Sequence, residues 1–342
     1  MDIILLVCLI VSIYRISINK KHFYVDSFLH ENTTIISGFF VVLVFMSHLS
    51  SYISKDNSVI YPLFTMVLGQ LIVAPFLLFS GYGVMKSIEQ KGDAYIRSFG
   101  IRRLFKIWYH FVLAICVYLI VASIKGTHYK SLRILRSFVG LSSVGNSNWF
   151  MFTMFCLYLM TMVSGLIFIR RKRTVPFAVS VLIIIYMFMM KHHGMSYYYY
   201  DTAFAYALGM FYELYENRIK DIFTKNNTVY FISFLTIIVV FIAASFWRSY
   251  THWMSSFIVW VSSFSFLLIL FSMKVKSNNK LLAILGTYSF EIYILQRLPM
   301  NLLYKNISNK YLFFFACVLI TGIISFLFKK ILLYIDKRLY LV

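Results

Sequence analysis

The chain contains repeated apolar runs that are long enough to cross a lipid bilayer. A helix needs about 20 mainly apolar residues to span the ~30 Å hydrocarbon layer, and such runs recur along all 342 residues. Hydrophobic residues make up 61% of the sequence and charged residues only 13%, which leaves too little polar surface for a soluble domain of this length. The sequence therefore predicts an all-α polytopic membrane protein.

Eleven apolar segments are candidate membrane spans, and together they predict a single bundle of 10–11 transmembrane helices. The first is expected to be a retained anchor rather than a signal peptide, because Met1-Asp2 gives no basic n-region and no small-x-small cleavage site follows. No internal repeat, Pro/Gly-rich linker or pair of interrupted helices is evident. The expected spans are 2–18, 34–54, 61–85, 106–124, 149–169, 175–190, 202–216, 229–247, 252–273, 281–299 and 311–328.

Basic residues gather in alternate loops between these spans. The positive-inside rule places such loops in the cytoplasm, so we expect the N-terminus outside and the C-terminus in the cytoplasm. The formal charge of +21 is then explained by membrane orientation, and nucleic-acid binding is not indicated. The 125–148 loop is basic yet lies on the outer side, where it either contacts an anionic substrate or is simply solvated. The basic groups expected in the cytoplasm are Arg15 with Lys20 and Lys21, the run from Lys86 to Lys106, Arg170 to Arg173, Arg218 with Lys220 and Lys225, Lys274 with Lys276 and Lys280, and Lys329, Lys330, Lys337 and Arg338.

The four cysteines each lie alone in an apolar stretch. No C-x-x-C or Cys/His spacing typical of zinc is present, so we expect no disulfide and no bound metal. The four residues, which fit small hydrophobic positions, are Cys8, Cys116, Cys156 and Cys317.

His48 is a titratable residue inside an apolar segment. Ionisable side chains at membrane depth are costly and are usually there for function. His48 lies about fourteen residues from the cytoplasmic end of its predicted helix, which is roughly 20 Å into the membrane. Ser37, eleven positions earlier, lies on the same helix face, so a cofactor entering from the cytoplasm could reach His48 along it. A structural histidine bonded to a neighbouring helix is an equally good interpretation of the position.

Two further segments combine small or basic residues with aromatic ones. Ser80-Gly81-Tyr82 allows close helix packing, which we favour, or backbone approach to a ligand. Arg102, Arg103 and Lys106 begin a helix on the expected cytoplasmic side. Their side chains could clamp phosphates, and anionic lipid headgroups are at least as common a partner for such a cluster.

The last motif, Leu285 to Gln296, places polar residues inside an apolar span. Ser289, Tyr293 and Gln296 are spaced by four and three, so they lie on one helix face. Glu291 points elsewhere at a depth where a carboxylate must be neutral or paired. It either orients a catalytic group or braces the bundle.

These elements, in this order, resemble the membrane acyltransferase-3 family, the polytopic O-acyltransferases of bacterial cell-surface glycans. The resemblance covers about residues 34 to 330, and it divides the chain into an extra N-terminal span with its cytoplasmic loop (1–33) and an acyltransferase-3-like transmembrane domain (34–342). The matching pieces are Gly38 through His48, Phe79-Ser80-Gly81-Tyr82, Arg102-Arg103-x-x-Lys106-Ile107, Ser147-Asn-Trp149-Phe with Tyr158, Leu208-Gly209-Met210, and Leu285-Gly286-x-x-Ser289-x-Glu291-Ile-Tyr293.

The chain departs from the family pattern at three positions. Ser37 stands where the family usually has Arg or Lys, so Arg102 or Arg103 would have to compensate. Gln296 stands where the family often has His, and His110 aligns with a Pro.

The resemblance implies transfer of an acyl group, usually acetyl, from cytoplasmic acyl-CoA to a sugar hydroxyl outside. His48 would act as general base or carry the acyl group transiently, with Glu291 as the second catalytic residue. The CoA phosphates would bind Arg102, Arg103 and Lys106. The remaining expected contacts are Ser80, Gly81 and Tyr82 with the thioester, and Trp149, Tyr293 and Gln296 with the acceptor.

The implied location is a bacterial plasma (inner) membrane, where the partners would be membrane lipids and a cell-surface glycan or lipid-linked sugar. A second hypothesis is an exporter or flippase of a lipid-linked glycan that transfers no acyl group, because Ser37 and Gln296 replace two residues typical of the family. The sequence does not indicate an oligomeric state or a particular acceptor.

Overall fold

The computed structural model describes residues 1–24, 28–53 and 58–339, and it is almost entirely helical. Seven helical segments in these residues are long and apolar enough to cross a membrane, which confirms the prediction of an all-α polytopic membrane protein. The seven segments are His30–Leu49, Gly69–Ile124, Trp149–Ile167, Lys172–His192, Asn227–Thr251, Met254–Lys274 and Lys310–Arg338.

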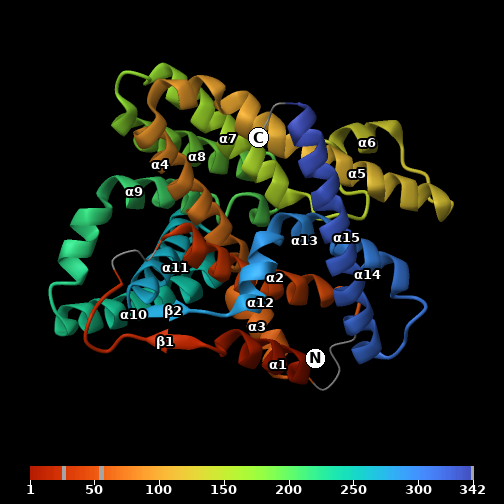
Figure 1. Ribbon diagram of the computed structural model, residues 1–342, viewed down its shortest axis with the longest axis horizontal. Helices are drawn as coiled ribbons and strands as arrows, with labels where there is room; N and C mark the ends of the chain where they lie inside the picture. The colour runs from red at the N-terminus through yellow and green to blue at the C-terminus, as the bar shows by residue number, and fades with distance from the viewer. Residues whose placement is uncertain (25–27, 54–57, 340–342) are drawn as a thin grey trace.

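Fifteen α-helices, short 3₁₀ and π segments and one two-stranded ladder make up the described residues (Figure 1). In chain order they are α1 (Asp2–Ile13), β1 (Ile16–Ile18), α2 (His30–Leu49), α3 (Ile60–Leu68), η1 (Gly69–Val73), α4 (Ala74–Phe99), η2 (Gly100–Phe105), α5 (Lys106–Ile124), α6 (Ser131–Ser137), α7 (Trp149–Ile167), η3 (Lys172–Thr174), α8 (Val175–His192), η4 (Tyr197–Tyr199), α9 (Phe204–Phe223), α10 (Asn227–Thr251), α11 (Met254–Lys274), β2 (Val275–Ser277), α12 (Lys280–Thr287), α13 (Ser289–Leu295), α14 (Arg297–Leu303) and α15 (Lys310–Arg338).

The N-terminal segment is shorter than the expected span 2–18. Helix α1 has 12 residues, about 18 Å at ~1.5 Å per residue, and β1 then pairs antiparallel with β2. The Asp2 carboxylate accepts hydrogen bonds from the backbone N–H groups of Val59 and Tyr61, each at 2.9 Å. These hydrogen bonds satisfy backbone N–H groups at the start of α3 and connect α1 to α3.

The expected spans 61–85 and 106–124 are joined by helix rather than by a loop. Gly92, at φ 65° and ψ −146°, folds α4 back on itself, and only glycine adopts such a φ without strain. The chain then continues through the π-helix η2 into α5.

The expected span 281–299 is divided into α12, α13 and the start of α14, with a bend at Tyr288. An interrupted helix that the sequence did not predict therefore lies within the last motif. Interrupted helices at membrane depth generally line protein interior or cavities rather than lipid.

Two pairs of glycines bring helix backbones into direct contact. A Cβ on Gly81 would overlap the carbonyl oxygen of Tyr206, and one on Gly209 would overlap that of Leu78, so α4 and α9 touch at these glycines. Gly38 and Gly286 form the equivalent pair between α2 and α12, against the carbonyls of Leu282 and Thr34. Small residues permit such close approach between membrane helices.

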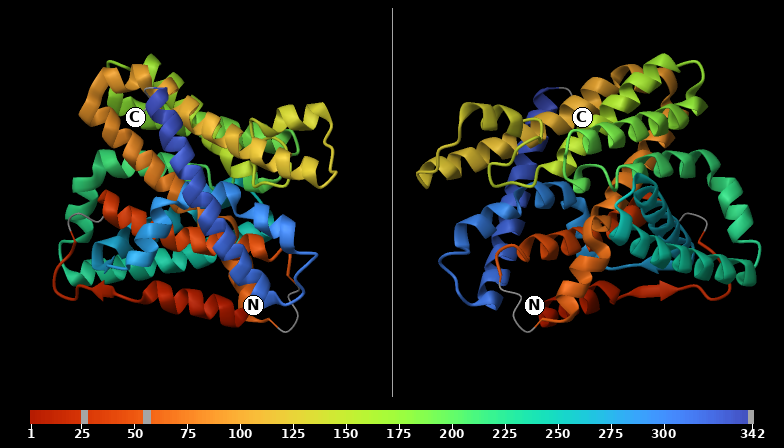
Figure 2. Two further views of the ribbon diagram at one scale, coloured as in Figure 1. Left: turned by 45° about the vertical axis from the view of Figure 1, so that its right-hand side comes forward. Right: turned by 180° about the vertical axis from the view of Figure 1, so that it is seen from behind.

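The two ends of the bundle carry different connections. In Figure 1 the β1–β2 ladder and the α9–α10 turn lie at the left, and α6 and the α14–α15 turn lie at the right. These loops are ones that the sequence assigns to opposite sides of a membrane. Helix α15 crosses the bundle obliquely (Figure 2), and α10 exposes most of its apolar side chains, as expected of a helix that faces lipid.

Candidate active site

His48 lies in the last turn of α2, next to the segment that joins α6 to α7. Its Nε2 is 3.2 Å from Ser147 Oγ, and its ring centroid is 6.1 Å from that of Tyr293 on α13. Helix α13 packs against α2, so the structure joins the first and last motifs of the sequence around this imidazole.

Three buried polar atoms of His48 and of the segment 293–296 have no hydrogen-bond partner among the described residues. They are His48 Nδ1, the Tyr293 hydroxyl and Gln296 Oε1. Gln296 is fully buried, and its Nε2 donates to the Tyr293 carbonyl at 3.3 Å. Buried polar groups without partners are costly and rare in structural positions. Such a cluster is typical of a site that receives the polar groups of a ligand.

The segment that reaches His48 belongs to the basic 125–148 loop. Gly145, at φ +103°, turns the chain, and its carbonyl accepts a hydrogen bond from Asn301 Nδ2 at 2.9 Å. Asn146 Oδ1 accepts from the Val144 N–H at 3.0 Å, which fixes the turn that presents Ser147. The end of this loop is therefore buried against the bundle, whereas its basic residues Lys125, Lys130, Arg133 and Arg136 are exposed, as the solvated interpretation of its charge expects.

Trp149 begins α7, two residues after Ser147. Its ring contacts Phe150 and Tyr198, at centroid distances of 6.1 and 5.8 Å. Phe150 in turn packs edge-on against Tyr293 at 5.0 Å. Trp149 thus belongs to the aromatic wall beside the imidazole, while the structure gives it no direct contact with His48.

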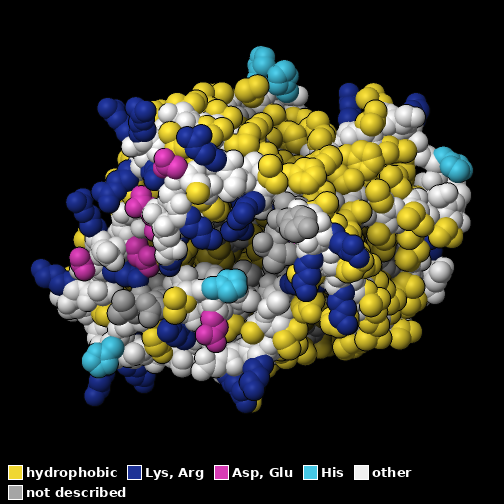
Figure 3. All heavy atoms as spheres, turned by 45° about the horizontal axis from the view of Figure 1, so that its top comes forward, with side chains coloured by type: hydrophobic (Ala, Val, Ile, Leu, Met, Phe, Trp, Pro, Cys, Tyr) yellow, Lys and Arg dark blue, Asp and Glu magenta, His cyan; other side chains and the backbone are white. Residues whose placement is uncertain are grey.

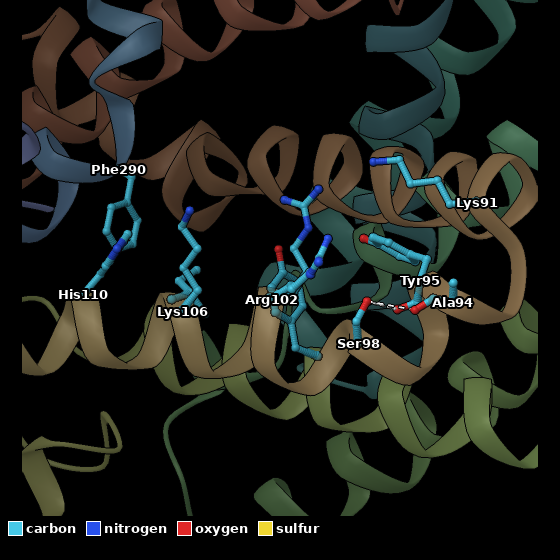
Figure 4. A pocket seen from close by; sticks show the side chains of 11 residues that line it. Lys91, Ala94, Tyr95, Ser98, Arg102, Lys106, His110 and Phe290 are labelled. Carbon is cyan, nitrogen blue, oxygen red and sulfur yellow. Dashed lines mark hydrogen bonds between the residues drawn. The ribbon is translucent and has the colours of Figure 1, made fainter. Parts of the chain in front are cut away.

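A separate basic cavity of about 670 Å³ lies between the returning arm of α4, η2, α5 and α13. Arg102, Lys106 and His110 line it from one helix face, Lys91 points in from the bend of α4, and Phe290 faces His110 (Figure 4). Figure 3 shows a hollow surrounded by Lys and Arg side chains. The full lining is Lys91, Ala94, Tyr95, Ser98, Arg102, Arg103, Lys106, Ile107, His110, Tyr158 and Phe290.

The π-helix η2 explains why these side chains share a face. Residues spaced by four drift forward around a regular α-helix with 3.6 residues per turn, whereas the wider turns of a π-helix offset them in the opposite direction, so a π segment between two α segments cancels part of the drift. Ser98, Arg102, Lys106 and His110 are spaced by four across η2, and all four line the cavity. π-helical turns often mark functional positions.

Two of the lining residues, Lys106 and His110, belong to an ion cluster centred on Asp336 of α15. Lys106 Nζ is 2.9 Å from Asp336 Oδ2, and His110 Nε2 is 3.0 Å from Asp336 Oδ1. The Tyr109 hydroxyl also donates to Asp336 Oδ1. Lys106 therefore carries a fixed carboxylate partner, whereas the exposed Arg102 and Arg103 form no ion pair among the described residues.

The cavity stops short of the imidazole. Its lining within the described residues does not include His48, and Phe290 is one helical turn from Tyr293 on α13. Tyr158, at the cavity wall, makes a 2.9 Å hydrogen bond with Ser80 Oγ, so Ser80 lies directly behind this wall. Helix α13 thus separates the cavity from the His48 cluster.

Gly81 and Tyr82 lie away from the cavity lining. The Cα of Gly81 packs on the α9 backbone, which supports the packing interpretation of this motif over the thioester contact. The Tyr82 hydroxyl donates to Glu216 Oε2 at 2.9 Å.

Glu291 points away from His48, toward α15. Its carboxylate is 3.8 Å from Lys329 Nζ, and Lys329 also donates to the Thr287 carbonyl. Buried charges in membrane helices are generally paired in this way. Of the two interpretations of Glu291, the geometry supports bracing of α13 against α15 rather than a contact with the imidazole.

Sequence reasoning missed three residues of these sites. Arg297, next to Gln296, contacts the same loop that holds His48, and its position inside an expected span was a signal of function. Tyr52 lies one turn beyond His48. Asp336 gave no signal, because a single acid in a basic tail is ordinarily solvated.

Comparison with known protein families gives one match. The model of a family described as "Acyltransferase domain" matches residues 35–330. No curated protein and no solved structure matches.

Proposed function

The chain belongs to this acyltransferase family. From that premise we propose that it transfers an acyl group, namely acetyl, from cytoplasmic acyl-CoA to a sugar hydroxyl on the outer side of the membrane. The acceptor is an extracytoplasmic polysaccharide or its lipid-linked precursor, and the location is a bacterial plasma (inner) membrane with the N-terminus outside. The observation that carries this proposal is the free His48 Nδ1 within a buried cluster of unpartnered polar atoms.

His48 has the geometry that a general base needs. A neutral imidazole has one N–H donor and one acceptor nitrogen. When Nε2–H donates to Ser147 Oγ, 3.2 Å away, Nδ1 presents a lone pair that can take the proton of an acceptor hydroxyl. Ser147 then holds the ring in this orientation, as a third residue commonly orients the catalytic base of an enzyme.

The basic cavity is suited to the anionic part of the donor. Arginine forks bind phosphate oxygens in pairs, and Arg102 and Arg103 reach this cavity without a carboxylate partner among the described residues. Ser37, which replaces the basic residue of the family, lies on a different helix, α2. We propose that Arg102 and Arg103 supply the missing charge.

Transfer then requires the thioester to pass α13. Phe290 lies at the cavity and Tyr293 at His48, one turn apart. We propose that movement of these two side chains opens the passage when the donor binds, as substrate binding completes the site in many enzymes.

The proposal is tested with inverted membrane vesicles that contain the protein and the surface glycan of its host. Radiolabelled acetyl-CoA supplied at the former cytoplasmic face is expected to give labelled glycan together with an equal amount of free CoA. Vesicles without the protein are the control. Normal glycan export with no label transferred would favour the exporter hypothesis and contradict the proposal.

Loss of the free cavity arginines is expected to weaken donor binding. The double variant Arg102→Gln and Arg103→Gln removes two charge-assisted contacts, each worth about 1.5–3 kcal/mol when made to a charged group, so the KM for acetyl-CoA should rise at least about 100-fold. Arg97→Gln is the matched control, because Arg97 is an exposed residue in the last turn of α4, directly before η2, and does not line the cavity. An unchanged KM in the double variant would place the phosphates elsewhere.

A further inference from the structure

Arg297 is a half-buried cation held in a fixed position at the His48 cluster. Its Nε donates to the Tyr52 hydroxyl at 3.2 Å, and its Nη1 lies 3.5 Å from the Asn146 carbonyl. Tyr52 is itself fixed, because its hydroxyl donates to Asn301 Oδ1 at 2.7 Å. The guanidinium is therefore anchored on one side, with the rest of its N–H groups available for another partner.

No acidic side chain neutralises this guanidinium within residues 1–24, 28–53 and 58–339. Lys106 and Lys329 are half-buried cations that have carboxylate partners, Asp336 and Glu291, whereas the buried Lys274 is held by backbone carbonyls and Asn227. A charge kept from water without a partner is costly. The charge of Arg297 therefore remains without a compensating carboxylate beside the His48 cluster.

The charge of Arg297 acts on the atoms that surround the reacting position. Its positive charge interacts electrostatically with the imidazole of His48 and the phenol of Tyr293. Asn146, whose carbonyl it contacts, directly precedes Ser147, the hydrogen-bond partner of His48. The Tyr293 hydroxyl is buried and has no hydrogen-bond partner in the part of the chain that the structure describes.

We propose that Arg297 and the Tyr293 hydroxyl stabilise the oxyanion that forms on the acyl carbonyl during transfer at His48. This inference rests on the proposed function. The acceptor oxygen attacks the thioester carbon while His48 takes the hydroxyl proton, and the carbonyl π electrons move onto oxygen. When the tetrahedral intermediate collapses, the oxyanion reforms the carbonyl, the C–S bond breaks, and the leaving thiolate takes the proton from His48, which gives the ester and free CoA.

The anchored guanidinium of Arg297 suits this task because it requires no reorganisation when charge develops. Preorganised donors of this kind are usually the largest single contribution in acyl transfer, and loss of one lowers kcat by about 10²–10³-fold. Recognition of an anionic acceptor would use the same charge but would act on binding. The two roles therefore separate in the kinetics.

The test compares Arg297→Gln, Arg297→Lys and Tyr293→Phe in the vesicle assay, with glycan loading and acetyl-CoA both varied. We expect Arg297→Gln to lower kcat about 10²–10³-fold with the KM for acetyl-CoA and the dependence on glycan unchanged. Arg297→Lys, which keeps the charge, should recover part of kcat, and Tyr293→Phe should lower kcat alone. Arg136→Gln, which removes an exposed cation at the same end of the molecule, should match the wild type.

Three results would overturn the inference. Restoration of the Arg297→Gln rate at high glycan loading would identify Arg297 as an acceptor-binding residue. A raised KM for acetyl-CoA at unchanged kcat would identify it as a donor-binding residue. Full activity per folded molecule would remove it from the chemistry altogether. A wild-type protein that transfers no acyl group would instead contradict the proposed function, so the two failures are distinguishable.

Discussion

Replacement of His48 by alanine is expected to lower the rate of acyl transfer in vesicles by about 10²–10⁴-fold, the usual contribution of a positioned general base. The reason is the free Nδ1, which lies among polar atoms that have no other partner in the described structure. His48→Gln should be equally inactive, because an amide can still bond Ser147 but cannot take up a proton at neutral pH. The measurement is the initial rate of label transfer per folded molecule, with folding checked by size-exclusion chromatography.

The matched control is His128→Ala, at an exposed histidine of the 125–148 loop at the same end of the molecule. We expect it to behave as the wild type. Transfer by the His48 variants at the wild-type rate would exclude both the general-base role and an acyl-histidine intermediate, and it would direct attention to the His110–Asp336 pair beside the basic cavity.

The sequence predicted the helical membrane class because that class depends on composition alone. Helix packing could not be predicted in the same way. The apolar run at 281–299 satisfied the length needed for a span, yet its chain is divided into three helices around Tyr288 and Gln296. Helices α12 and α13 pack against α2 and α15, and such tertiary contacts cannot be predicted from the local sequence pattern.

The site was predicted in part for a similar reason. His48, Tyr293 and Gln296 were found because polar residues in apolar segments are conspicuous, and the structure brings His48 and Tyr293 together, with Gln296 hydrogen-bonded to the Tyr293 carbonyl. Glu291 was equally conspicuous, but its partner Lys329 is distant in sequence and showed only as one charge of a basic tail. Burial marks a residue as important, whereas tertiary contacts decide its role.

Gly81 is a further residue whose role the sequence left open, because the motif Ser80-Gly81-Tyr82 was compatible with either ligand contact or helix packing. Gly81→Ala would drive a methyl group into the Tyr206 carbonyl, and overpacking of this kind typically costs 1–3 kcal/mol. We expect a lower folded yield and a lower unfolding temperature in detergent, with activity per folded molecule retained. Gly209→Ala, on the facing helix, should have the same effect.

Gly83→Ala is the control within the same motif. A Cβ at Gly83 meets no atom within 4 Å, and alanine favours helix over glycine by about 1 kcal/mol, so this variant should be at least as stable as the wild type. If Gly81→Ala folds normally but loses activity per folded molecule, the glycine contacts the thioester and the packing explanation is wrong. If both variants unfold alike, the sensitivity belongs to α4 as a whole, because only direct contact with the α9 backbone distinguishes two glycines that lie two residues apart.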